Sequence, residues 1–345
     1  MNFNKMIQEI HSEPLQTLLS TARCEESIPL NIYASEPDAL DPSMRQGMPF
    51  NFPRLGDVLE IQGPPASGKS HLLYLLMIIC IIPTTYASTS LGGWGKVTIL
   101  YDTDATFDLA RFKQLLTSHL AMALKNKDSN DLQILVKRSL QNLHIFRPSS
   151  SIQLAATLFR LPSYHQINLP DSEIGILAID SMSAFCWADR FTAEQLRATP
   201  TSRVNESHNP LKHVIVALQQ FHHTHKPLIV FTNWGLTPEV IEDERGSSSY
   251  RQHLNPPPAL FPAVEVSATS EHSFASALPL TFHITLSMAK VPQFPVDLSF
   301  TDACTQRSFA TRHITGIIRS AHSSQTSRIT FNIEADHMDL PIVLS

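Results

Sequence analysis

The sequence predicts an α/β fold with a mostly parallel central sheet, helices on both faces and a β-rich C-terminal end. Three observations lead to this prediction. Between residues 56 and 232, short apolar runs alternate with longer segments of helical spacing. The run Ile174 to Ile179 is continuously apolar, as expected of a parallel strand buried on both faces. From Thr281 onward the apolar runs become β-like, as expected of late strands that finish the sheet.

The elements are expected in a regular order along the chain. Residues 1–50 combine a short helical candidate with a polar, proline-bearing stretch and are expected to form an N-terminal arm or linker. Residues 51–345 are expected to form one core, with residues 236–280 as a flexible loop insert marked by a charged cluster and the prolines of NPPPALFP. Strands are expected at 56–62 (after a turn), 96–101, 143–146, 174–179, 227–232, 282–288, 315–320 and 328–333. Helices are expected at 71–82, where Pro83 ends the helix, and at 107–124, 151–161 and 211–221.

Composition excludes several classes of protein. With 43% hydrophobic and 17% charged residues, the 345-residue chain is globular rather than wholly disordered, collagen-like or coiled-coil. The net charge of −5 gives no overall basic field, so any DNA contact needs a local patch. The longest apolar run, residues 72–82, is well short of the roughly 20 residues that span a bilayer, so no membrane contact is expected. The four cysteines have no CxxC spacing and the N-terminus has no secretory pattern, which favours cytosol or nucleus.

A phosphate-binding loop follows the first expected strand directly. The match to GxxxxGK[ST], the Walker A pattern, consists of Gly63, Pro64, Pro65, Ala66, Ser67, Gly68, Lys69 and Ser70. In such a loop, glycines let backbone N–H groups turn inward around a phosphate, and the helix N-terminus adds partial positive charge. Lys69 is expected to reach the β- and γ-phosphates, and the Ser70 hydroxyl to join the shell of a magnesium ion. The alternative is a chance match on a surface turn, which the strand before and the apolar helix after the loop disfavour.

A second element of the expected site is Asp180. It follows the apolar run and precedes Ser181, which is the Walker B pattern. An acid at the carboxyl end of a central strand lies where α/β sheets bind ligands, beside the phosphate loop. We therefore expect Asp180 to hold magnesium through water. The alternative is an aspartate that caps the next turn.

The sequence Asp102-Thr103-Asp104 ends the intervening strand and leaves two interpretations open. Asp104 is a candidate catalytic residue, because an acid at this place can orient the water that attacks a phosphate. Asx side chains are also good helix caps, and both aspartates lie just before the helix expected near Phe107. The sequence does not decide between these roles.

In this order the segments resemble the RecA-type recombinase family, and in particular its short eukaryotic paralogues. The likeness covers residues 54–235 and is carried by GDVLEIQGPPASGKSHLLYLL, ILYDTDATFDLARF, IDSMSAFCWADRF and LIVFTN, of which Asp180 to Arg190 is the most specific part. It implies a RecA-like P-loop ATPase core that binds ATP and Mg²⁺. It also implies a nuclear accessory or adaptor role in double-strand break repair by homologous recombination. The partners would be other recombinase paralogues in a heteromeric complex, the recombinase filament, and single-stranded DNA, bound weakly or through those partners.

Two departures from the active members of that family bear on catalysis. Those members carry Glu where Asp104 stands, and the aspartate is one methylene shorter. They also carry Asn-Gln where this chain has Asn233-Trp234, and Trp cannot both donate and accept as an amide does. We therefore expect ATP turnover to be absent, or weak and DNA-dependent. The alternatives are an active DNA-dependent strand-exchange recombinase, a small-molecule P-loop kinase, and a degenerate paralogue that binds no nucleotide.

The two segments that would contact DNA have little positive charge. The first, between Trp187 and Lys212, has a balance of +1, from Arg190, Arg197, Arg203 and Lys212 against Asp189, Glu194 and Glu206. The second, within residues 236–280, has a balance of −4, from Arg245 and Arg251 against Glu239, Glu242, Asp243, Glu244, Glu265 and Glu271. Because phosphate contact supplies most non-specific affinity, the second segment is not expected to hold DNA alone. The histidines at 222, 223 and 225 are expected at the end of a surface helix rather than in a metal site.

Overall fold

The computed structural model describes residues 53–124, 129–197, 209–239, 249–254, 278–287, 297–302, 305, 312–321, 323–334, 337–338 and 342–344. The expected N-terminal arm, residues 1–50, and most of the segment 236–280 lie outside these residues. Within the described part of the chain, no helix is long and apolar enough to cross a membrane.

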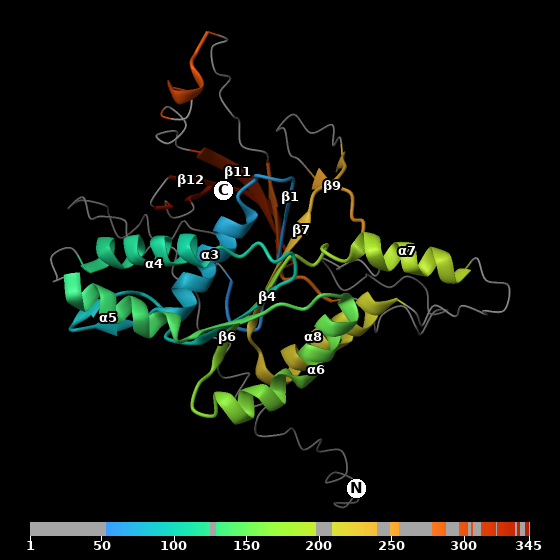
Figure 1. The fold of residues 1–345 in the computed structure, drawn as a ribbon, viewed down its shortest axis with the longest axis horizontal. Coiled ribbons are helices and arrows are strands. Elements are labelled where there is room, and N and C mark those ends of the chain that lie inside the picture. Colours follow the sequence, from blue (N-terminus) through green and yellow to red (C-terminus); the bar gives the residue numbers. More distant parts are fainter. Residues whose placement is uncertain are drawn as a thin grey trace, which may run out of the picture.

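The described residues form a nine-stranded sheet in the order β13-β12-β11-β10-β1-β7-β6-β4-β5 (Figure 1). The strands from β10 to β5 in that order are mutually parallel, and β11, β12 and β13 continue the sheet antiparallel. The parallel strands are β1 (Val58–Gly63), β4 (Val97–Asp102), β5 (Leu143–Phe146), β6 (Ile174–Asp180), β7 (Leu228–Trp234) and β10 (Phe282–Leu286). The antiparallel strands are β11 (Arg312–Ser320), β12 (Ser323–Ile333) and β13 (Ile342–Leu344). Among the described residues, two further strand pairs are short: β2 (Thr85–Tyr86) with β3 (Thr89–Ser90), and β8 (Pro238–Glu239) with β9 (Ser249–Tyr250).

Helices cover the sheet on both faces. On one side lie α3 (Lys69–Ile81), α4 (Leu109–Leu124) and α5 (Ser129–Leu140), and on the other α6 (Ser151–Asn168) and α8 (Pro210–His225) (Figure 1). A hydrophobic core lies on each face of the sheet, and alternate residues of a strand point into one core or the other. In β6, Ile176 and Ala178 pack with α3, whereas Leu177 and Ile179 pack with α6 and α8. This alternation explains the continuously apolar strands, since both faces of each are buried.

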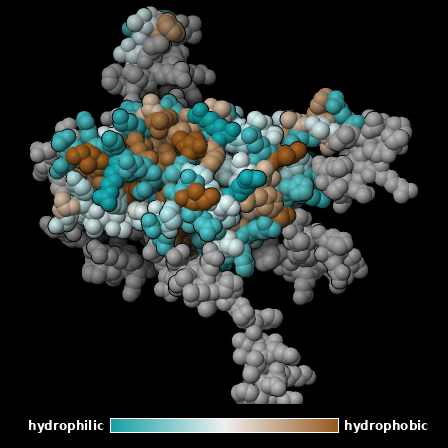
Figure 2. Space-filling model, turned by 60° about the horizontal axis from the view of Figure 1, so that its bottom comes forward, coloured by the Kyte–Doolittle hydropathy of each residue, from teal (hydrophilic) through white to brown (hydrophobic). Residues whose placement is uncertain are grey.

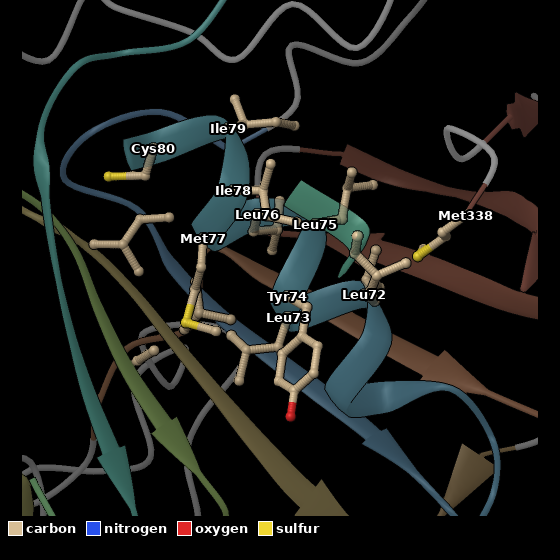
Figure 3. Close-up of a cluster of buried hydrophobic side chains, with 14 of the residues drawn as sticks. Leu72, Leu73, Tyr74, Leu75, Leu76, Met77, Ile78, Ile79, Cys80 and Met338 are labelled. Carbon is tan, nitrogen blue, oxygen red and sulfur yellow. The ribbon is translucent and has the colours of Figure 1, made fainter. Parts of the chain in front are cut away.

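Helix α3 is buried over most of its circumference. Every residue from Leu72 to Ile81 is buried, so the helix lacks a polar face and lies inside the molecule. Figure 3 shows these side chains pointing in all directions from the helix, with Met338 from the C-terminal part near Leu72 and Leu75. Because the phosphate loop leads directly into α3, this packing fixes the position of the loop.

The predicted fold class is confirmed, and so are the expected strands that lie in the described residues. Two helices were missed. Helix α5 follows α4 after residues 125–128, and α7 (Cys186–Arg197) extends away from the sheet, with none of residues 186–195 fully buried (Figure 1). Both helices have polar residues over much of their surface, so their sequences contain no long apolar run that would have predicted a helix. Within residues 236–280, the described parts include the strand pair β8–β9 rather than loop alone.

The surface is mixed in polarity. Figure 2 shows apolar residues in several small patches among hydrophilic ones on the face turned toward the viewer. Exposed large apolar side chains include Leu109, Met122, Ile152, Trp187 and Phe191. Single apolar residues of this kind are normal on folded proteins.

Candidate nucleotide site

The predicted site residues meet at the carboxyl ends of four neighbouring parallel strands. In the sheet register Gly63 of β1 lies beside Trp234 of β7, and Asp180 of β6 lies beside Asp102 of β4. Strands β1, β7, β6 and β4 are consecutive in the sheet, so the Walker A loop and the two acidic strand ends share one edge. Open α/β sheets bind ligands at this edge.

Backbone geometry and packing hold the Walker A loop in place. Gly68 has φ +89°, a left-handed conformation that favours glycine. A Cβ at this position would lie 3.2 Å from Cγ1 of Ile314 and 3.4 Å from the ring of Phe331. The antiparallel strands β11 and β12 therefore support the loop from behind. Ala66 also has a positive φ, of 60°, at the exposed tip.

The interior of the loop has the features that a phosphate group requires. A Cβ on Gly63 would lie 2.6 Å from Oγ of Ser67 and 2.8 Å from the carbonyl oxygen of Leu286, so a larger residue would fill the space. The Ser67 hydroxyl is buried and has no hydrogen-bond partner among the described atoms. Gly68, at the N-cap of α3, supplies no side-chain cap, which leaves the first N–H groups of the helix free to bind an anion. The loop residues thus fit the phosphates of a nucleotide.

Lys69 contributes a positive charge to this loop. Its Nζ donates to the carbonyl oxygens of Gly63 and Pro64, each at 2.8 Å. Burial lowers the pKa of Lys69 to about 8, while the carboxylates of Asp180 and Asp104 act in the opposite direction. An incoming phosphate would compensate for the lost hydration of this ammonium group.

Asp180 lies buried beside the loop and is held by two hydroxyl groups. Thr232 of β7 donates to its Oδ1 at 2.5 Å, and Ser70 of α3 also donates to it. Burial raises the pKa of Asp180, and these hydrogen bonds together with Lys69 oppose the rise. The structure therefore brings together the two predicted magnesium ligands, Ser70 and Asp180. A carboxylate and a hydroxyl oxygen are ligands that Mg²⁺ accepts.

The two aspartates at the end of β4 have different hydrogen-bond partners. Asp102 is buried, accepts from the backbone N–H groups of Thr106 and Phe107, and forms an ion pair with Arg147 at 2.9 Å. It therefore caps the turn before α4, and the helix itself is capped by Asp108, which accepts from the N–H of Arg111.

Asp104 is directed toward the site instead. Its Oδ2 accepts from the Ser181 hydroxyl at 3.2 Å, and its charge acts on Lys69. Partial burial raises the pKa of Asp104, and the charges of Asp180 and Asp102 add to the rise. Asp104 is thus the aspartate of this pair whose carboxylate lies near the predicted phosphate position.

A buried polar network beside the loop was missed in the sequence. Glu60 of β1 is buried, and its Oε1 accepts from Nδ2 of Asn233 at 2.9 Å and from Nε2 of Gln252 at 3.4 Å. Burial raises the pKa of Glu60 to about 7. A glutamate between the apolar residues Leu59 and Ile61 of this strand was a visible signal for such a network. Nothing in the sequence pointed to Gln252, which is 192 residues away.

The first predicted DNA segment is described only in part. In α7, Arg190 lies 5.8 Å from the ring of Trp187 and pairs with Glu194 at 3.0 Å. Arg203 and Glu206 lie outside the described residues, as do Glu242, Asp243, Glu244, Arg245, Glu265 and Glu271 of the second segment. The histidines at 222, 223 and 225 end α8 as predicted. Among the described residues, no group of three or more His, Cys, Asp or Glu side chains could hold a metal ion.

Comparison with known proteins finds similar sequences, among them two DNA repair proteins. No protein-family model matches the chain. It is 26% identical over 205 residues to a "DNA repair protein XRCC2 homolog" of Arabidopsis thaliana, covering 52% of this chain and 54% of the relative. It is 29% identical over 160 residues to "DNA repair protein XRCC2" of Mus musculus, covering 46% of this chain and 52% of the relative. The chain therefore spans about half the length of these curated relatives.

These similarities agree with the sequence resemblance to the recombinase paralogue X-ray repair cross-complementing protein two. The fold agrees as well, because the sheet, the loop after β1 and the acid at the end of β6 have the arrangement expected of a RecA-like core. The chain is thus similar in sequence to XRCC2 proteins over about half of its length, and its α/β fold is consistent with a RecA-like core.

Proposed function

We propose that the protein binds ATP with Mg²⁺ and serves as an accessory factor in the repair of double-strand breaks by homologous recombination. The proposal is carried by one observation: the Walker A loop, Lys69, Ser70 and Asp180 converge at one edge of the sheet in a chain similar to two DNA repair proteins. Its place of action would be the nucleus. Its partners would be other recombinase paralogues and the recombinase filament on single-stranded DNA.

The residues of the loop have separate roles in nucleotide binding. The N-terminal N–H groups of α3 and the Ser67 hydroxyl would donate to phosphate oxygens, and Lys69 would exchange its two carbonyl partners for phosphate. Asp180 and Ser70 would hold Mg²⁺, which neutralises phosphate charge when bound. Thr232 would keep the Asp180 carboxylate oriented.

Features of the site support binding more strongly than rapid hydrolysis. Asp104 would be the carboxylate that orients water, and it accepts a hydrogen bond from the Ser181 hydroxyl. Its side chain is one methylene shorter than glutamate, and misplacement on the order of 1 Å costs about a hundredfold in rate. In the described part of α7, the charge of Arg190 is paired with Glu194, which gives DNA little to bind. An adaptor that uses ATP to order its contact with a paralogue fits these features.

ATP turnover tests the proposed function. The purified protein would be assayed alone, with single-stranded DNA, and with a recombinase filament whose disassembly is followed in parallel. The adaptor proposal expects slow or absent turnover in every case and slower filament disassembly when ATP is present. Strong DNA-stimulated turnover would instead establish a recombinase in its own right. DNA-independent turnover with a small phosphate acceptor would establish a kinase.

A further inference from the structure

The two glycines that bound the Walker A loop both lie against the C-terminal strands. A Cβ on Gly63 would lie 2.8 Å from the carbonyl oxygen and 3.3 Å from Cβ of Leu286, on β10. A Cβ on Gly68 would lie 3.2 Å from Cγ1 of Ile314, on β11, and 3.3 Å from Cδ1 of Ile333, on β12. Both ends of the loop are therefore fitted against strands from the other end of the described chain.

The support behind the loop is buried and fixed on its far side. Ile314 lies opposite Phe331 in the register of β11 and β12, and each of these two residues is at most 2% exposed. Directly after Ile333, the carbonyl oxygen of Glu334 accepts from Nη2 of Arg111, on α4, at 2.7 Å. Because protein interiors are close-packed, these side chains cannot retreat from the loop without disturbing their neighbours.

The position of Gly68 decides where the first N–H groups of α3 point. Gly68 is the N-cap of this helix, has a left-handed φ of +89°, and accepts at its carbonyl oxygen from the N–H of Leu72. Because glycine has no side chain, Ile314 and Ile333 face its backbone directly, with no flexible group in between. A hydrogen bond weakens steeply when its donor is misaligned, so a shift of this backbone lowers the affinity for a phosphate.

We propose that Ile314 and Ile333 are positioning residues for nucleotide binding, which hold Gly68 so that the N–H groups at the start of α3 converge on a phosphate group. The inference deepens the proposed function and rests on ATP binding at the Walker A loop. Isoleucine supplies no hydrogen-bond donor to a phosphate, so each side chain acts through the backbone of Gly68 by filling the space behind it. By thermodynamic reciprocity, bound nucleotide stabilises the packing of β11 and β12 against the loop by the same factor.

Two alanine variants separate positioning from stability. Ile314 and Ile318 lie on the same face of β11 and are each 1% exposed, but Ile318 lies about 13 Å farther along the strand. Ile314→Ala and Ile318→Ala remove the same atoms from the core, so both are expected to lower the urea midpoint of unfolding by similar amounts. Only Ile314→Ala is expected to weaken the binding of a fluorescent ATP analogue with Mg²⁺, by about fivefold or more.

A milder pair keeps the test decisive if Ile314→Ala fails to fold. Ile333→Val removes only Cδ1, the atom that faces Gly68. Ile329→Val removes the same atom at a buried position nearer the middle of β12 and is the matched control. Loss of one buried methyl group has a small effect on stability. Nucleotide binding is expected to weaken by about twofold or more in Ile333→Val and to stay at the wild-type level in Ile329→Val.

The outcomes separate this inference from the proposed function. Weaker binding confined to Ile314→Ala and Ile333→Val would support the inference. Equal affinities within each pair, whether weakened or not, would overturn it, while saturable binding by the wild type would leave the proposed function intact. Absence of binding by the folded wild-type protein would contradict the proposed function and the inference together.

Discussion

Asp102 and Asp104 stand two residues apart at the end of β4 and serve different purposes. Asp102 satisfies two backbone N–H groups and pairs with Arg147, while Asp104 is directed toward Lys69 and Ser181. The sequence could not separate them, because both lie just before a helix and both are suitable caps. Only the turn of the chain after β4 decides which carboxylate points inward and which toward the site.

Because the two aspartates differ in their contacts, their replacement by alanine is expected to affect different properties, stability for Asp102 and ATP turnover for Asp104. Asp102→Ala removes the acceptor of two buried N–H groups and is expected to lower the free energy of unfolding by about 1–3 kcal/mol. Asp104→Ala is expected to change it by less than about 0.5 kcal/mol, because its carboxylate is only partly buried, and to reduce any ATP turnover instead. Urea denaturation of the two variants, with turnover measured beside it, checks this. Equal destabilisation by both would contradict the assignment.

The buried carboxyl group of Glu60 predicts a pH dependence of stability. Burial raises its pKa from 4.5 to about 7 in the folded protein, so folding favours the protonated form. This contribution is fully present below pH 4.5 and is lost as the pH rises through about 7. The groups that face Glu60 cannot produce the same change of stability with pH. Asn233 and Gln252 are neutral amides. Burial lowers the pKa of His283 to about 4, and the charge of Arg319 adds to the lowering.

Glu60→Gln tests this dependence without removing the acceptor for Asn233. The free energy of unfolding of the variant, minus that of the wild type, is expected to rise by up to about 3 kcal/mol between pH 4.5 and pH 8. Denaturant titrations of both proteins across this range measure the difference, and ionisable groups common to both proteins cancel. Parallel pH profiles would show that folding does not raise the pKa of Glu60.

At the scale of elements, the helices differ in what they contribute to stability. Phe221 of α8 is buried in the core beneath the sheet, whereas Phe191 of α7 is 61% exposed. Phe221→Ala is therefore expected to cost about 3–5 kcal/mol, and Phe191→Ala less than about 0.5 kcal/mol. Thermal unfolding of this matched pair measures the contrast. A large cost for Phe191→Ala would show that α7 packs against a part of the chain outside the described residues.

The predictability of each element follows from how it is buried. The strands β4, β6 and β7 and the helix α3 were predicted because burial on all sides leaves an uninterrupted apolar run. Helices α5 and α7 were missed because partial exposure interrupts their apolar spacing with polar residues. The site residues of the Walker A loop are contiguous and could be predicted, whereas the pairing of Glu60 with Gln252 depends on tertiary contact between distant segments.

At the scale of the whole molecule, the candidate nucleotide site depends on residues from nearly the full described chain. The loop itself is local, but Ile314 and Phe331 support Gly68 from strands that come some 250 residues later. The similarity to the XRCC2 relatives covers about half of the chain. The order of the strands brings this later part to the loop, because β10 pairs with β1 and carries β11 and β12 beside it.

Equilibrium binding of a fluorescent ATP analogue with Mg²⁺ tests the central claim most directly. The wild type and Lys69→Ala would be compared, with Lys226→Ala at the end of α8 as a control that removes a lysine away from the loop. Saturable binding by the wild type and the control, with at least about tenfold weaker binding by Lys69→Ala, is the predicted result. Equal binding by all three proteins, or none by the folded wild type, would contradict a nucleotide site at the Walker A loop.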